Sequence, residues 1–143
     1  MIEQVSADLS EYRLQKAKDL LIQAKLLHNN KKYDGSINRS YYAIFNGIRS
    51  LLALVKLDSS KHSGVIGYFD RYFVKTNIFD TKYSKIIHSA FDCRQDNDYE
   101  DFYSPTEDES LEQLNDSEEF INEVDSKIKQ FIRNEIQLPA IDI

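Results

Sequence analysis

Residues 37–55 read INRSYYAIFNGIRSLLALV, and this stretch decides the fold. One apolar face repeats at alternating steps of four and three residues, which is the period of a helix: Ile37, Tyr41, Ile44, Ile48, Leu51 and Val55. Tyr42, Phe45 and Leu52 add a second apolar face. A helix that is apolar on two faces must be covered on both. The stretch therefore predicts a hydrophobic helix at the centre of a bundle or at a dimer interface.

Similar periods predict four further helices around this one. They cover residues 9–28, 65–73, 81–94 and 111–133. We expect an all-α, up-and-down bundle of four to five helices over residues 1–133, with the second helix in its centre. Residues 134–143, which contain Pro139, are expected to form a loose tail.

Polar residues at the predicted helix starts indicate caps. Asp34 can cap the central helix, and Asp80 or Thr81 can open the fourth. Thr106 and Glu109 have the spacing of a capping box at the start of the fifth helix.

The composition favours helices and restricts the chemistry. Four Gly and two Pro are few for 143 residues, which make one domain by length. A single cysteine excludes an internal disulfide and a multi-cysteine zinc site. No secretory signal pattern is present, and no uninterrupted stretch approaches the roughly 18 apolar residues of a membrane span. We therefore expect a cytoplasmic protein without membrane contact.

The net charge of −6 is divided unevenly along the chain. Residues 1–99 carry 15 Lys and Arg against 11 Asp and Glu, whereas residues 100–143 carry 3 against 13. An acidic protein is a poor non-specific ligand for nucleic acid, but a locally basic surface can hold phosphates. Any nucleic-acid contact is expected in the first hundred residues. For the acidic residues 100–143, the plain interpretation is the solvated face of a surface helix.

The most unusual polar stretch is Arg94-Gln95-Asp96-Asn97-Asp98-Tyr99, at the end of the predicted fourth helix. The planar fork of an arginine suits phosphate or carboxylate, so Arg94 is a candidate anion site. The alternative is an ion pair between Arg94 and Asp98, which are four residues apart on one helix face.

Two further stretches place polar groups in apolar surroundings. Lys61-His62-Ser63-Gly64 stands where the third helix begins, and helix starts bind phosphates readily. Ordinary capping by Ser60 or Ser63 is the alternative. Ser40 lies inside the hydrophobic central helix, where its hydroxyl needs a backbone or side-chain partner.

Other kinds of site lack their sequence patterns. The three histidines, His28, His62 and His88, stand in different predicted elements, and no Glu-x-x-His pair or Gly-rich phosphate loop occurs. Cys93 fits a small apolar residue on a packed helix better than a nucleophile. We expect neither a metal nor a cofactor.

Three of these stretches together resemble the HEPN family, the higher eukaryotes and prokaryotes nucleotide-binding domain. They are SYYA at residues 40–43, KHSGV at residues 61–65, and Arg94 followed by Asp98-Tyr99. The resemblance spans residues 9–132 and points to the small stand-alone bacterial and archaeal HEPN proteins. It implies an all-α bundle that is usually a homodimer and is often encoded beside a minimal nucleotidyltransferase as a toxin and antitoxin pair.

The resemblance also implies a site. In HEPN ribonucleases an arginine is followed four to six residues later by a histidine, and the pair cleaves RNA without metal. Arg94 matches the arginine, but Tyr99 stands where the histidine is expected, and no histidine follows it. A phenol with a usual pKa of about 10 is a poorer general base at neutral pH than an imidazole at about 6.5.

The resemblance therefore favours a nucleotide- or RNA-binding protein that acts with a nucleotidyltransferase. The residues assigned to phosphate or nucleotide binding are Arg94, Asp98, Tyr99, Lys61, His62, Ser63, Ser40 and Tyr41. One alternative is a metal-free endoribonuclease toxin in which His62 or Tyr99 moves protons, and another is a structural dimer or substrate-presenting subunit without its own site. In some related pairs the nucleotidyltransferase adenylylates a tyrosine near the motif, and Tyr99, or else Tyr103, would be that acceptor.

Overall fold

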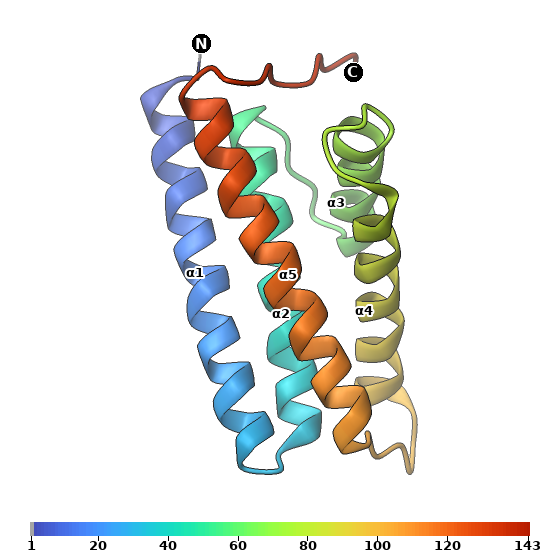
Figure 1. The fold of residues 1–143 in the computed structure, drawn as a ribbon. Helices are drawn as coiled ribbons and strands as arrows, with labels where there is room; N and C mark the ends of the chain where they lie inside the picture. Colours follow the sequence, from blue (N-terminus) through green and yellow to red (C-terminus); the bar gives the residue numbers. More distant parts are fainter. Residues whose placement is uncertain (1) are drawn as a thin grey trace.

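The computed structural model describes residues 2–143, which form helices joined by short loops and contain no strand (Figure 1). The helices are α1 (Gln4–Asn29), α2 (Tyr33–Leu54), α3 (His62–Phe69), α4 (Thr81–Tyr99) and α5 (Glu107–Ile132). A short π-helical segment, η1 (Asp70–Val74), continues α3. The predicted all-α bundle is confirmed. No helix within the described part of the chain combines the length and apolarity needed to cross a membrane.

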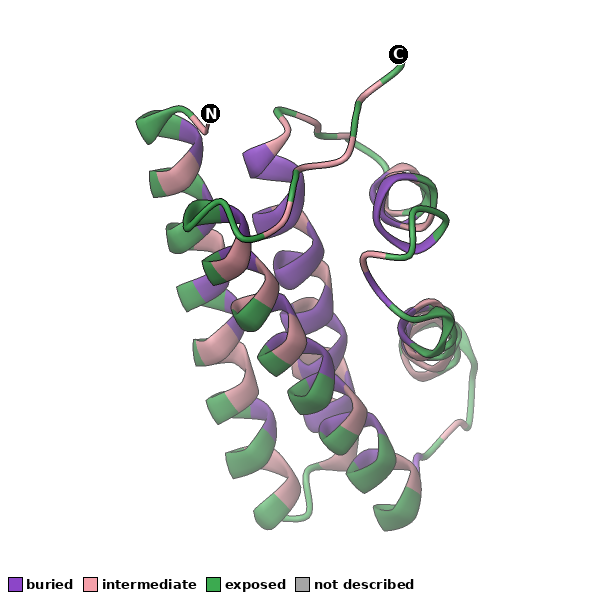
Figure 2. Ribbon diagram, turned by 45° about the horizontal axis from the view of Figure 1, so that its top comes forward, coloured by how far each residue is buried: buried purple, intermediate pink, exposed green. Residues whose placement is uncertain are grey.

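The core is built around α2, as the two apolar faces of its sequence predict. This helix contacts α1, α3, α4 and α5, and Figure 2 shows much of its ribbon in the colour of buried residues. Gly47 lets α5 approach closely, because a Cβ placed there would lie 2.5 Å from Cδ1 of Ile121. The largely buried α2 is thus the helix on which the other four pack.

The expected caps are confirmed for α4 and α5 but not for α2 or α3. The Asp80 side chain accepts from the Lys82 amide, and Thr106 and Glu109 form the capping box. Lys32, not Asp34, is the residue before α2, and the Asp34 carboxylate binds the amide of Gly35. Neither Ser60 nor Ser63 caps α3, which begins directly after Lys61 without a side-chain cap.

The first helix begins five residues earlier than its apolar repeat predicts. Ser6 and Ser10 are buried and extend the stripe that Leu14 and Ala17 continue. Serine is small enough to fit against a neighbouring helix, but a repeat of apolar residues does not count it. The pattern therefore missed the first turns of α1.

Residues 134–143 are not loose, although they form no helix. Ile136, Leu138 and Ile141 pack against the core. Asp142 accepts hydrogen bonds from Tyr72, over 2.7 Å, and from Arg71, over 2.8 Å. Figure 1 shows this segment crossing the end of the bundle where both termini lie.

Candidate functional site

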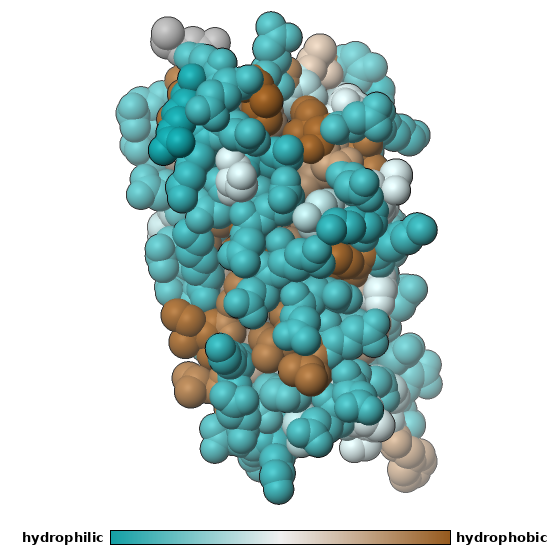
Figure 3. Space-filling model, in the orientation of Figure 1, coloured by the Kyte–Doolittle hydropathy of each residue, from teal (hydrophilic) through white to brown (hydrophobic). Residues whose placement is uncertain are grey.

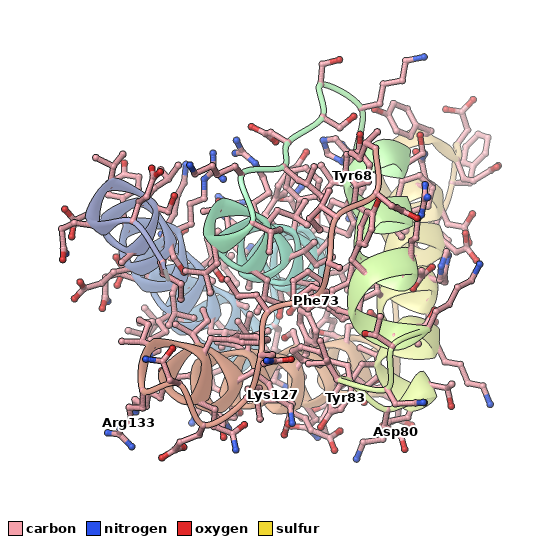
Figure 4. All side chains as sticks on the ribbon, turned by 90° about the horizontal axis from the view of Figure 1, so that it is seen from above. Tyr68, Phe73, Asp80, Tyr83, Lys127 and Arg133 are labelled. Carbon is pink, nitrogen blue, oxygen red and sulfur yellow. The ribbon has the colours of Figure 1, made fainter. Side chains whose placement is uncertain are left out.

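One side of α2 is left without a covering helix. In Figure 4, α1, α5 and the pair α3 and α4 lie on three sides of α2, and only the loop that follows α2 crosses the fourth. The α2 residues on this side are half-buried and follow a helical spacing: Asn38, Tyr42, Phe45 and Arg49. The functional candidates of the sequence meet on this side.

Arg94, in the last two turns of α4, is held against three tyrosine rings. Its guanidinium carbon lies 5.4 Å from the ring centre of Tyr41, 5.5 Å from that of Tyr42 and 5.6 Å from that of Tyr99. The face of an aromatic ring is negative and attracts a cation at such distances. The Arg94 side chain is therefore only 13% exposed and still fully charged.

Two polar contacts fix the orientation of the Arg94 fork. Nη2 donates to the hydroxyl of Tyr42 over 2.9 Å, and Nε lies 2.9 Å from Oδ2 of Asp98, at ion-pair distance but out of line for a hydrogen bond. Burial lowers the pKa of Arg94, but its electrostatic interactions with Tyr42 and Asp98 outweigh burial and leave it above its usual value. Nη1 makes no hydrogen bond within residues 2–143 and is not buried, so its donors remain available to a ligand.

His62, the first residue of α3, lies in the same cluster. Its Nδ1 is 2.7 Å from the hydroxyl of Tyr41, and its ring stacks on that of Phe45 with centres 4.2 Å apart. Burial and the charge of Arg94 lower the pKa of His62, so the imidazole is neutral at pH 7. Burial also raises the pKa of Tyr41, which keeps its proton. One ring nitrogen of a neutral histidine is thus tied to Tyr41, and the other is left for a ligand.

The structure brings together most, but not all, of the residues selected from the sequence. Arg94, Asp98, Tyr99, Tyr41 and His62 form one connected cluster. Lys61 and Ser63 are exposed and make no side-chain hydrogen bond or ion pair with residues 2–143. Ser40 is buried behind the cluster, and its hydroxyl has no partner in the same range, contrary to the expectation that it must have one.

Tyr42 and Phe45 belong to the site, although the sequence pattern predicts them only as core residues. Both lie on the uncovered side of α2, where the hydroxyl of Tyr42 accepts from Arg94 and the ring of Phe45 stacks on that of His62. The available signal was their spacing, since both share a helix face with the polar residues Asn38 and Arg49.

A second hollow lies between α4 and α5 and is acidic. Its lining includes Asp92, Asp96, Glu109 and Glu112. Cys93 is half-buried there, and burial raises the pKa of its thiol, which makes it a poor nucleophile. No group of three or more His, Cys, Asp or Glu side chains in the described residues is placed to hold a metal ion.

Comparison with known proteins identifies the family. The model of the HEPN domain matches residues 10–128. The chain belongs to the HEPN family. It is 32% identical to a UPF0332 protein of Thermotoga maritima over 123 residues, covering 86% of this chain and 93% of that protein.

Other relatives of this HEPN chain bear a toxin name. It is 34% identical over 116 residues to "Putative toxin MJ0605" of Methanocaldococcus jannaschii, covering 81% of this chain and 86% of that protein. A second protein of that organism, "Putative toxin MJ0142", is 34% identical over 90 residues, covering 63% of this chain and 61% of that protein. The whole cluster from Tyr41 to Tyr99 falls within the matched HEPN residues.

Proposed function

We propose that this HEPN protein binds a nucleotide or RNA through a phosphate held by Arg94, and that it acts with a minimal nucleotidyltransferase as one member of a toxin and antitoxin pair. The observation that carries the proposal is the Arg94 fork, which Tyr42 and Asp98 orient while its Nη1 donors stay unpaired. The toxin names of two relatives support the second half of the proposal.

Titration with AMP and with a short RNA at low salt tests the phosphate site. Charge-assisted hydrogen bonds contribute about 1.5 to 3 kcal/mol, so Arg94→Ala should weaken binding of both ligands by roughly 10- to 100-fold. Arg94→Lys keeps the charge but loses the fork, so its affinity should lie between that of the parent and that of Arg94→Ala. Arg71→Ala removes an exposed arginine that pairs with Asp142, and should leave binding unchanged. If Arg94→Ala binds as well as the parent, Arg94 is a structural residue only.

A metal-free endoribonuclease is the second candidate, and the position of His62 favours it. A neutral imidazole oriented by Tyr41 beside a fixed arginine can replace the histidine that the motif lacks. His62 would take the proton of the RNA 2′-hydroxyl as its oxygen attacks phosphorus. Arg94 would stabilise the charge on the phosphate, and the departing 5′-oxygen would receive a proton from the phenol of Tyr99, which water would then restore.

Cleavage of RNA in the presence of EDTA tests this candidate. General acid–base groups contribute about 10²- to 10⁴-fold, so His62→Ala should reduce the cleavage rate by that factor while AMP binding persists. RNA that stays intact at high protein concentration would contradict the endoribonuclease candidate and leave binding as the only proposed function.

Tyr99 is the better candidate for modification by the nucleotidyltransferase. It is 70% exposed at the last residue of α4. Tyr103 is half-buried, and its hydroxyl donates to Glu109 over 2.7 Å. Incubation with the nucleotidyltransferase and ATP should add one AMP group to the intact mass of the parent but not to that of Tyr99→Phe. Addition to Tyr99→Phe would reassign the acceptor.

A further inference from the structure

We propose that the Arg94 cluster is one end of a longer track along α2, and that Arg49 and Arg13 hold a second phosphate of the same single-stranded RNA. This inference rests on the proposed function and adds a second subsite to it. A track of this kind selects an oligonucleotide over a mononucleotide.

On the uncovered side of α2, each successive turn offers a side chain that can contribute to RNA binding. Tyr42 binds Arg94, Phe45 stacks on His62 one turn further, and Arg49 follows after another turn. A helix rises about 1.5 Å per residue, so Tyr42 and Arg49 are about 10 Å apart along the axis. Successive phosphates of one strand are about 3.4 Å apart along the axis of a DNA duplex, so on that scale the two ends of the track are separated by more than one nucleotide step.

The second subsite consists of two arginines that share one carboxylate. Oδ2 of Asp58 lies 3.0 Å from Nη2 of Arg49 and 3.6 Å from Nη2 of Arg13. Arg13 also donates to the backbone oxygen of Arg49 over 3.1 Å, which holds its fork in place. Two cations and one anion leave a positive charge at this end of α2.

The two arginines and the carboxylate differ in how firmly they are held. The Arg13 side chain is 12% exposed between α1 and α2, whereas that of Asp58 is 50% exposed on the loop after α2. Burial and the neighbouring charge of Arg49 lower the pKa of Arg13, as expected where positive charges are crowded. Oδ1 of Asp58 also accepts from the amide of Ser59 over 2.8 Å, so in this proposal a phosphate displaces only Oδ2 of Asp58 from the two arginines.

A shallow hollow extends from His62, at the edge of the Arg94 cluster, to Arg49. It is lined by Phe45, Arg49, Asp58, Ser59, Ser60 and His62. The stacked rings of Phe45 and His62 offer an aromatic surface, and stacking on such surfaces binds bases of any sequence. The two serines add hydroxyl groups suited to sugar or phosphate oxygens. The competing hollow between α4 and α5 is lined by carboxylates and repels a polyanion.

Fluorescence anisotropy with a labelled oligouridylate of about ten nucleotides, together with titration of UMP, tests the track. Arg49→Gln should weaken oligouridylate binding roughly 10-fold and leave UMP binding unchanged. Asp58→Asn frees both arginines and should tighten oligouridylate binding severalfold, a gain that a folding defect cannot produce. Arg71→Gln is the matched control and should change neither ligand.

The outcomes separate this inference from the proposed function. Unchanged oligouridylate binding in Arg49→Gln, or no gain in Asp58→Asn, overturns the second subsite and leaves these residues as a staple for the loop. If Arg94→Ala binds both ligands as the parent does, the proposed function itself fails. An equal loss of UMP binding in Arg49→Gln also overturns the track, because the two subsites would then be one.

Discussion

Arg94 gains its fixed position from neighbours that also stabilise the fold. A cation over an aromatic face contributes about 0.5 to 1 kcal/mol at an exposed site, and Arg94 faces three rings. The pair with Asp98 adds about 0.3 to 0.5 kcal/mol. Replacement by alanine therefore destabilises the protein whether or not a phosphate binds. Binding measurements are needed to separate the two roles.

The pKa of His62 reports on its distance from Arg94. Burial lowers this pKa and the charge of Arg94 lowers it further, so it should titrate below about 6.5 in the folded protein. In Arg94→Gln the pKa should rise but stay below the unfolded value, because burial persists. Following the ring protons by NMR over pH measures both values. Arg71→Gln is the control and should leave the pKa of His62 in place.

The lowered pKa of His62 also determines how the stability of the protein changes with pH. The unfolded chain binds a proton at His62 more readily than the folded chain does, so the contribution of His62 is lost as pH falls through the interval between the unfolded and folded pKa values. A His62 pKa at or above the usual value, or one indifferent to Arg94→Gln, would contradict the geometry.

The sequence predicted part of this cluster. Arg94 and Asp98 are four residues apart on one helix face, so their pairing could be inferred from spacing. Tyr99 is five residues from Arg94 and does not share that face, so its approach to Arg94 could not be inferred in the same way. The approach of His62 depends on how α3 packs beside α2, and the contact with Tyr42 depends on how α4 packs. Such contacts between helices are not encoded in any local spacing. For the same reason the pairing of Arg13 with Asp58 could not be anticipated.

At the scale of elements, the apolar period of α2 was a reliable guide, and the small residues were not. Two apolar faces correctly predicted a central helix, whereas buried Ser6 and Ser10 concealed the start of α1. Gly47 likewise reads as a weak point in a helix, although it permits the contact with Ile121. The tail was misjudged because its apolar residues follow no period, yet they pack on the core.

Gly47 and Gly67 form a matched pair for testing the contact between α2 and α5. Both lie in helices, and alanine should gain a similar helix propensity at each. A Cβ at Gly47 meets Cδ1 of Ile121 at 2.5 Å, while one at Gly67 meets nothing within 4 Å. Overpacking costs about 1 to 3 kcal/mol, so Gly47→Ala should be less stable than Gly67→Ala by that amount. Urea unfolding of the two variants measures the difference, and equal free energies of unfolding would show that Ile121 moves aside freely.

At the scale of the whole molecule, the surfaces differ in character. Figure 3 shows the face formed by α1 and α5 as largely hydrophilic, with an apolar patch in its lower part. The exposed apolar side chains of these two helices include Ile22, Leu26 and Leu111. Residues 100–143 carry 13 Asp and Glu against 3 Lys and Arg, so α5 and the tail repel nucleic acid. In the proposed function, this charge would direct a strand to the uncovered side of α2.

This arrangement limits how many phosphates the protein can neutralise, and the salt dependence of binding measures that number. For a single strand, the logarithm of the binding constant falls with the logarithm of salt concentration with a slope of about −0.7 for each phosphate contact. One contact at Arg94 and one at Arg49 with Arg13 give an expected slope of about −1.4. Arg49→Gln should halve it, since one contact is lost, and Arg71→Gln should not change it. A parent slope several times steeper would mean that the strand runs over basic residues outside the track, and a slope near zero would mean that no phosphate is held at all.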